Sequence, residues 1–344
     1  METGASEALF AGLDLHSSNV WCGIVDGEGR RVFGKRLGAD LGLVLGELEP
    51  YRQRLKAVTV ESTYNWYWLV DGLLAAGYAV RLANPARTSR YEALKVSTDR
   101  SEAFWLAEML RLGILPEGYI YPKEIRPVRD MLRRRGLIVR QRTQIVLSLQ
   151  SMVARQTGRQ IGGGTLRRWA LPEIEEFFED RWSRQTARSM VELIRSHDAH
   201  EQELNGQVLE RVKLFGPYKN LLGVPGIGRV LAVTIMLETG PIERFASAGH
   251  YASYCRMVQS RRESNRKNKG ENNRKNGNKY LGWAFVEAAN FAQRYNRVAQ
   301  GWFDRKRARG GRALAVKALG CKMSKAVFYI LRDGVAFDLK LMFG

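Results

Sequence analysis

The start of the chain alternates short apolar runs with polar turns, a pattern typical of β-strands. Apolar residues dominate 9–15 and 20–25, and the polar turn His16–Asn19 separates these two runs. The turn sequence Asp-Gly-Glu-Gly at 26–29 precedes a third strand-like run at Arg31–Leu37. The pattern therefore predicts three antiparallel strands joined by short turns.

Helical and strand patterns alternate in the next part of the chain. Leu41–Tyr51 has apolar residues at helical spacing, Lys56–Glu61 is a buried type of strand, Trp66–Ala76 is helical, and Tyr78–Leu82 is another strand. Strands that alternate with helices indicate an α/β layer. Three antiparallel strands followed by parallel crossovers are typical of the ribonuclease H type of fold. We therefore predict one α/β domain over residues 1–120.

Two long and mostly polar helices are predicted in the middle of the chain, at Pro122–Gly158 and Thr186–Val212. Each has one apolar seam, and the three glycines at 162–164 between them form a hinge. Such a pair predicts an antiparallel coiled coil, whose usual role is to hold subunits together. We assign residues 121–215 to this helical linker.

The last part, residues 216–344, is predicted to be mostly helical. Within Lys219–Gly240, the sequence Gly-Val-Pro-Gly-Ile-Gly resembles the turn of a helix-hairpin-helix, which presents backbone N–H groups to a phosphate. Met257–Gly277 has almost no apolar residues and predicts an exposed loop. Two helices follow, at Tyr280–Tyr295 and Ala313–Leu331, with a basic connecting segment at Arg305–Arg312.

The net charge of the chain indicates a polyanionic partner. The chain has 55 Lys and Arg against 35 Asp and Glu, a net charge of +20. A field of one sign is the footprint of a polyphosphate partner. An anionic membrane surface would instead need an amphipathic helix with an apolar face, and the basic loop is rich in Asn and Gly. We predict that nucleic acid is bound by Arg133, Arg134, Arg135, Arg261, Arg262, Arg266, Lys267, Lys269, Arg274 and Lys275.

The composition also indicates where in the cell the protein is located and which kind of metal ion it would bind. The sequence has no apolar run of about 18 residues, the length of a membrane-spanning helix, and its N-terminus does not have the pattern of a secretory signal. Three widely spaced cysteines fit a reduced cytoplasmic protein without a disulfide or zinc framework. Because only four histidines occur, a histidine-based metal site is not expected, and carboxylate ligands favour a hard cation such as Mg²⁺.

Four acidic residues stand where the predicted fold brings them together. Asp14 lies in the first strand, Glu61 ends the fourth, and Asp99 and Glu102 are three residues apart at the start of a helix. In a ribonuclease H type of sheet the first and fourth strands are neighbours, and a helix packed across them brings the other two acids to the same point. Four carboxylates repel one another there unless they hold divalent cations, which predicts a two-metal site for phosphodiester chemistry. The alternative for the last two is structural: an N-cap and its capping-box partner.

These motifs, in this order, resemble those of a known family. Gly12–His16 reads GLDLH, Val60–Ser62 reads VES, and Thr98–Ala107 reads TDRSEAFWLA. They look like the acidic motifs of the DEDD-type transposases of bacterial insertion sequences, the IS110 family, whose N-terminal domain is similar to that of the RuvC Holliday-junction resolvase. The resemblance continues through 119–135, Leu221–Phe245 and Asn276–Ala289, so it covers most of the chain.

The resemblance implies a site-specific recombinase with two sets of functional residues. It implies that Asp14, Glu61, Asp99 and Glu102 bind Mg²⁺, although the last departs from the usual aspartate. It also implies a C-terminal serine that attacks DNA and forms a covalent phosphoserine intermediate. The best match is Ser264, and the second is Ser260.

The same resemblance implies partners and an assembly. A non-coding bridge RNA would pair with target and donor DNA, and subunits would form dimers or tetramers with active sites shared between protomers. We therefore expect an RNA-guided DNA recombinase. One alternative is a metal-dependent nuclease of resolvase type, with water as the nucleophile. Another is a nucleic-acid-binding protein without activity, in which the acids are only caps and core residues.

Overall fold

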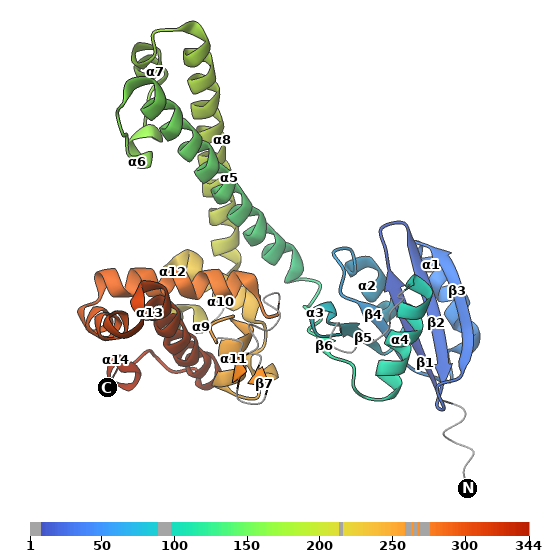
Figure 1. The fold of residues 1–344 in the computed structure, drawn as a ribbon. Helices are drawn as coiled ribbons and strands as arrows, with labels where there is room; N and C mark the ends of the chain where they lie inside the picture. The colour runs from blue at the N-terminus through green and yellow to red at the C-terminus, as the bar shows by residue number, and fades with distance from the viewer. Residues whose placement is uncertain are drawn as a thin grey trace. The chain divides into compact units, whose positions relative to one another are not determined.

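The computed structural model describes residues 8–88, 98–212, 216–258, 263–264, 267–268 and 276–343 (Figure 1). Contacts within the chain divide it into two compact units, of which the N-terminal one ends at Lys123 and the C-terminal one begins at Glu124. The four predicted acids therefore belong to the N-terminal unit, whereas the candidate serine belongs to the C-terminal unit. The predicted further boundary at residue 215 stays a prediction.

A six-stranded sheet forms the centre of the N-terminal unit. Its strands are β1 (Leu9–Leu15), β2 (Asn19–Asp26), β3 (Arg31–Gly38), β4 (Leu55–Glu61), β5 (Val80–Ala83) and β6 (Glu117–Gly118), in the order β3-β2-β1-β4-β5-β6. The pairs β1–β2 and β2–β3 are antiparallel, whereas β4 is parallel to both β1 and β5. The predicted α/β layer is confirmed, including the position of the fourth strand beside the first.

Helices cover both faces of this sheet (Figure 1). They are α1 (Leu41–Leu48), which continues into a 3₁₀ turn (Glu49–Tyr51), α2 (Tyr67–Ala75), α3 (Pro85–Thr88) and α4 (Asp99–Arg111). The odd-numbered residues of β1 join one core with Val44 of α1 and Leu69 of α2. Phe10 faces the other side, where it packs with Phe104 and Ala107 of α4. Since side chains alternate along a strand, Gly12 and Asp14 also face α4.

A row of three glycines allows α4 to pack directly on the strands. Gly12, Gly23 and Gly34 are register partners across β1, β2 and β3. A Cβ atom on Gly12 would lie 2.1 Å from the carbonyl oxygen of Ala103, and one on Gly34 would lie 2.7 Å from the ring of Phe104. The missing side chains therefore set how closely the start of α4 approaches the end of β1.

An antiparallel pair of long helices begins the C-terminal unit. It consists of α5 (Arg126–Thr157) and α8 (Arg181–Val212), with the short helices α6 (Gly163–Leu166) and α7 (Leu171–Phe177) between them. Gln156 near the end of α5 bonds Ser183 near the start of α8, while Arg135 bonds Asn205. The two helices therefore run in opposite directions, as the sequence predicts.

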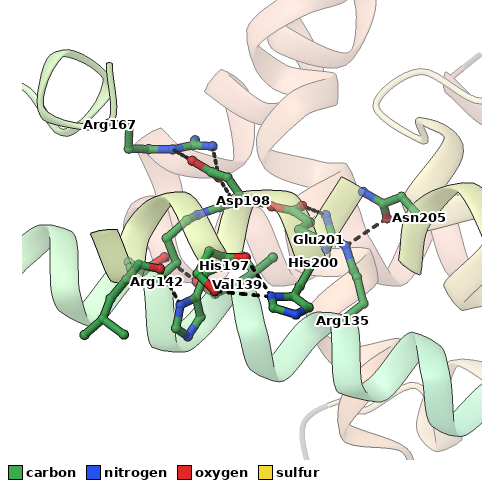
Figure 2. Close-up of polar contacts among 12 residues, drawn as sticks. Arg135, Val139, Arg142, Arg167, His197, Asp198, His200, Glu201 and Asn205 are labelled. Atoms are coloured by element: carbon green, nitrogen blue, oxygen red, sulfur yellow. Dashed lines mark hydrogen bonds and ion pairs between the residues drawn. The ribbon is translucent and has the colours of Figure 1, made fainter. Parts of the chain in front are cut away.

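Ion pairs tie the two long helices together on their polar sides. Figure 2 shows Arg142 and Arg167 directed at Asp198, and Arg135 directed at Glu201 and Asn205. Arg142 also pairs with Glu201. Two arginines of α5, Arg135 and Arg142, are therefore neutralised by acids of α8.

The remaining elements are mostly helical. They are α9 (Pro217–Leu222), α10 (Arg229–Thr239), a 3₁₀ turn (Ile242–Arg244), α11 (Ala248–Tyr254), β7 (Glu263–Ser264), β8 (Lys267–Asn268), α12 (Lys279–Tyr295), α13 (Arg297–Asp333) and α14 (Leu339–Phe343). Their common core includes Tyr251, Phe285 and Leu319. Within the polar loop predicted at Met257–Gly277, β7 and β8 form a short antiparallel pair.

Two details of this part do not follow from the sequence pattern. The glycine-rich turn before α10 packs against α12, where a Cβ atom on Gly226 would lie 2.2 Å from the carbonyl oxygen of Ala288. This glycine is therefore required for helix packing. The predicted connecting segment at Arg305–Arg312 is wrong, because α13 is helical on both sides of a single break at Gly311, where φ is 78°. Arg, Lys and Ala are strong helix formers, and two adjacent glycines give only a local break.

None of the helices in the described residues is both long and apolar enough to cross a membrane.

Candidate metal centre

Asp14 is the buried centre of the candidate site. It lies next to the end of β1, and its side chain is only 1% exposed. Its strand neighbours fix its place, because Leu13 pairs with Val60 of β4 and Asp14 itself pairs with Trp21 of β2. A buried carboxylate is costly unless it is paired or bound to a metal. The groups around Asp14 therefore determine whether it is paired within the chain or suited to a metal ion.

His16 links Asp14 to the start of α4. Its Nε2 atom lies 3.0 Å from Oδ2 of Asp14 and 3.4 Å from Oδ2 of Asp99. One ligand atom from each of these three residues lies within 4.8 Å of the others. Sequence reasoning missed His16 because it treated the residue as part of a turn. The spacing Asp-x-His at the end of a strand was the available signal, since alternate residues of an extended chain share a face.

Two buried polar atoms at this point lack a proper hydrogen bond. Asp14 Oδ2 and His16 Nε2 lie 3.0 Å apart, and His16 Nε2 also lies 3.4 Å from Asp99 Oδ2, but neither Asp14 Oδ2 nor His16 Nε2 has a hydrogen bond of proper geometry among the described residues. An unsatisfied buried polar atom calls for an explanation, such as an ion. Two carboxylates and an imidazole around one point suit a divalent cation. The residues present therefore fit a metal ion, without selecting Mg²⁺ over others.

The electrostatics of Asp14 agree with this interpretation. Burial, the largest cause, raises the pKa of Asp14 to about 6; the charge of His16 opposes the rise, while Glu102 and Asp99 add to it. The protein thus disfavours the ionised form of a carboxylate that sits among other acids. A cation at this point would reverse the effect, because it favours the charged form.

The first turn of α4 carries Asp99 and Glu102, and neither of them forms its cap. Thr98 is the N-cap, its side chain accepts a hydrogen bond from the backbone N–H of Ser101, and Ser101 completes the capping box. The alternative in which Asp99 and Glu102 form the cap is therefore wrong. Both lie in the first turn of the helix, and Asp99 is half exposed.

Glu61 ends β4, next to the strand that carries Asp14. It follows Val60, the register partner of Leu13, and it is half-buried. Val58 and Val60 belong to the core on the α1–α2 side, so alternation places Glu61 on the α4 side. Of the four predicted acids, the structure brings Asp14 and Asp99 into one cluster with His16, puts Glu102 within electrostatic reach, and places Glu61 at the adjacent strand end.

The candidate nucleophile lies in the C-terminal unit. Ser264 is in β7, with Lys267 as its register partner in β8, and only their backbones are described. Ser260 and six of the predicted nucleic-acid contacts lie outside the described residues: Arg261, Arg262, Arg266, Lys269, Arg274 and Lys275. Their roles stay predictions.

The arginine triplet of α5 is divided between internal and exposed roles. Arg133 bonds both oxygens of Glu238, at 2.6 and 2.9 Å, and Arg135 pairs with Glu201. Arg134 is exposed. Nucleic-acid binding by these three stays a prediction, and Arg134 is the member best placed for it.

Comparisons with known proteins agree with the order of these parts. A model for DEDD-type IS110 transposases matches residues 11–156, which include all four acids, and the model described as "Transposase IS116/IS110/IS902 family" matches 218–302, which include Ser264. An uncharacterized 43.6 kDa protein of insertion element IS110 from Streptomyces coelicolor is 27% identical over 125 residues, 36% of this chain and 31% of that protein. A putative transposase, y4qE, from Sinorhizobium fredii is 25% identical over 233 residues, 66% of this chain and 55% of that protein. The matched segments thus span about a third and about half of these relatives.

Proposed function

We propose that this chain, which belongs to the IS110 family of insertion-sequence transposases, is an RNA-guided recombinase that cuts and rejoins DNA. The observation that carries the proposal is the cluster of Asp14, His16 and Asp99, with its unsatisfied buried atoms. A cluster of this composition is suited to phosphodiester chemistry.

The acids of the N-terminal unit provide the first half of the mechanism. Asp14, Asp99, Glu61 and Glu102 would hold a divalent cation, together with the imidazole of His16, which lies between Asp14 and Asp99. When bound, a divalent cation supplies positive charge to the scissile phosphate and to the leaving oxygen.

Ser264 provides the second half. Its Oγ attacks the phosphorus of the scissile phosphate and loses its proton, and a serine–phosphate ester forms. The bond from phosphorus to one ester oxygen of the strand breaks, and this oxygen leaves as a hydroxyl. A hydroxyl of another strand then attacks the ester, the DNA bond re-forms, and the serine is released. Since one ester replaces another at each step, no external energy source is required.

The partners follow from the family resemblance. A non-coding bridge RNA pairs with donor and target DNA and selects the strands. The chain acts as a dimer or tetramer, whose subunits share active sites. The basic residues of the loop around Ser264 support contact with a phosphate backbone, because cations there neutralise its charge.

The second candidate is a metal-dependent nuclease of resolvase type. It is favoured by the fact that the acidic cluster is complete within one unit, without Ser264. Water would then be the nucleophile, and the products would be free ends.

Attachment of DNA to protein distinguishes the two candidates. The chain, purified with its accompanying RNA, is incubated with Mg²⁺ and DNA that carries the junction of its own element, and the products are denatured. We expect a protein–DNA adduct that disappears in Ser264→Ala and in Asp14→Asn but persists in Ser260→Ala. Cleaved DNA without an adduct in the wild type would establish the hydrolytic nuclease instead.

A further inference from the structure

A cavity of about 760 Å³ lies in the C-terminal unit, between α12 and the second half of α13. Met257 and Val316 are part of its apolar floor, and both are buried. Its mouth is open to solvent. The volume is within the range of pockets that hold a ligand of several rings, so it exceeds the need of a single small ion.

Four cations line this cavity: Arg256, Lys279, Arg312 and Lys317. No acid is among its lining residues in the described part of the chain. Cations gathered around one concavity repel one another and create a strong positive potential, which an anion relieves. The local charge therefore selects a negatively charged occupant.

The backbone holds Arg256 in an unusual conformation at this wall. Its φ is 57°, the only positive value among the described residues other than glycine. Its guanidinium donates two hydrogen bonds to the carbonyl oxygen of Gly277, at 3.2 and 3.0 Å. Burial also lowers the pKa of Arg256, so its charge is partly desolvated. Strain of this kind persists where the surroundings enforce it, often at functional sites.

The position of the cavity connects it with the candidate nucleophile. Arg256 precedes the segment that carries Ser264, and Lys279 follows it. The residues that flank that segment on its two sides, Arg256 and Lys279, therefore both line the cavity.

Exposed aromatic rings on α12 begin next to the cavity at Trp283 and continue around the helix away from it, which indicates a strand with unpaired bases. Trp283 and Phe291 follow the lining residues Gly282 and Asn290, so they lie about 100° further around α12. Trp283, Phe291 and Tyr295 are 45%, 43% and 74% exposed, and the last two rings are stacked. Cations that follow a phosphate backbone next to aromatic rings are typical of single-strand binding.

We propose that this cavity binds backbone phosphates of a single-stranded segment of nucleic acid, whose bases lie against the aromatic residues of α12. The inference rests on the proposed function, because it takes a nucleic-acid strand as the partner. It adds the place where that strand is held and the residues that hold it.

The test measures binding of fluorescent 20-nucleotide strands, one of DNA and one of RNA with the same sequence, to the full-length protein at several salt concentrations. The double variant Arg312→Gln/Lys317→Gln removes charge from the cavity, and Arg305→Gln/Arg309→Gln removes the same charge from the exposed first half of α13. Ala313→Trp fills the cavity without a change of charge, and Ala308→Trp is its exposed match on the same helix.

We expect both cavity variants to weaken binding about ten-fold relative to their matched controls. The charge variant should also reduce the slope of log affinity against log salt by roughly 1.4, about 0.7 for each phosphate contact on a single strand. Loss confined to RNA would assign the cavity to the guide strand, and loss confined to DNA would assign it to the cleaved strand. Cavity variants that behave like their controls would overturn the inference and leave the proposed function intact. A wild type that binds neither strand would overturn both.

Discussion

At the residue scale, the properties of Asp14 follow from its place in the sheet. The strand buries its carboxylate, and α4 brings two further acids toward it. His16 is the neighbour that lowers the pKa of Asp14, but its effect does not outweigh that of burial. The folded chain alone therefore does not stabilise the charge of Asp14, and a bound cation would.

The raised pKa of Asp14 predicts how the stability of the folded state depends on pH in metal-free buffer. The pKa of Asp14 is raised from 3.8 to about 6, so the folded state binds this proton more tightly than the unfolded state. Stability is therefore lost as pH rises from about 4 to 6, by up to about 3 kcal/mol. We expect Asp14→Asn, which has no charge to bury, to unfold at a higher temperature than the wild type above pH 6 in the presence of EDTA. A difference between the two proteins that does not change with pH would contradict this argument.

The position of His16 predicts a direct effect on metal affinity. His16→Ala removes one of the three groups around the candidate site, so a divalent cation should bind at least about ten-fold more weakly. The readout is the rise in unfolding temperature during titration with Mg²⁺ or Mn²⁺. The matched control is His200→Ala, an exposed histidine of α8. If His16→Ala and the wild type show the same titration curve, His16 is not part of the metal centre.

At the element scale, the packing of α4 depends on side chains that are absent. The helix contacts β1, β2 and β3 across a row of glycines, and its first turn carries Asp99 and Glu102. A shift of the helix away from the sheet would therefore also separate these acids from Asp14. We therefore expect stability and metal binding to be coupled through this one contact.

Gly12→Ala tests that coupling. Its Cβ atom would lie 2.1 Å from a backbone oxygen, which cannot move alone, so α4 must shift. We expect a loss of stability of about 1–3 kcal/mol, together with a loss of cation-induced stabilisation. Gly46→Ala in α1 is the control, because nothing lies within 4 Å of its added methyl group. Retention of full metal binding by Gly12→Ala would show that the acids do not depend on the position of the helix.

A second contact between elements joins α5, α10 and α12. Glu238 of α10 is fully buried and accepts hydrogen bonds from Arg129, Arg133 and Asn278. Burial acts to raise the pKa of Glu238, but the hydrogen bond from Arg133 and the charges of both arginines outweigh it, so its pKa is lowered. Arg133 also lies over the ring of Tyr280. The base of the long helical pair is thereby fixed to the helix that begins just after the candidate serine segment.

Removal of this carboxylate predicts a large loss of stability. Glu238→Ala leaves two guanidinium groups without their shared acid, which costs about 3–5 kcal/mol for a buried pair. Denaturant unfolding followed by circular dichroism measures the loss. Glu192→Ala, which breaks an exposed pair with Arg188 on α8, should cost less than about 1 kcal/mol. Equal losses in the two variants would show that the buried network does not hold these helices together.

At the scale of the whole molecule, the sequence predicts the order of elements better than their contacts. Alternation of apolar residues predicts β1 to β5, and the helical spacing predicts α5, α8 and α12. The role of His16 and the row of Gly12, Gly23 and Gly34 depend on strand register and on the placement of α4. Neither follows from local pattern, because each involves residues far apart in the sequence. For the same reason, a run of arginines that looks like a nucleic-acid surface proves to be partly an internal ion-pair network.

The division of the reaction between two units leads to the last prediction. The acids lie in the N-terminal unit and Ser264 in the C-terminal one, so one active site can take them from two different copies of the chain. Asp14→Asn and Ser264→Ala are each expected to be inactive. If acids and serine of one site come from different protomers, a mixed dimer of these two variants has one competent site. Random mixing then restores roughly a quarter of wild-type adduct formation, since half of the dimers are mixed and each has one good site out of two. Recovery after co-expression, measured as protein–DNA adduct, would establish shared sites. If the mixture stays as inactive as either variant, each site takes its acids and its serine from a single copy.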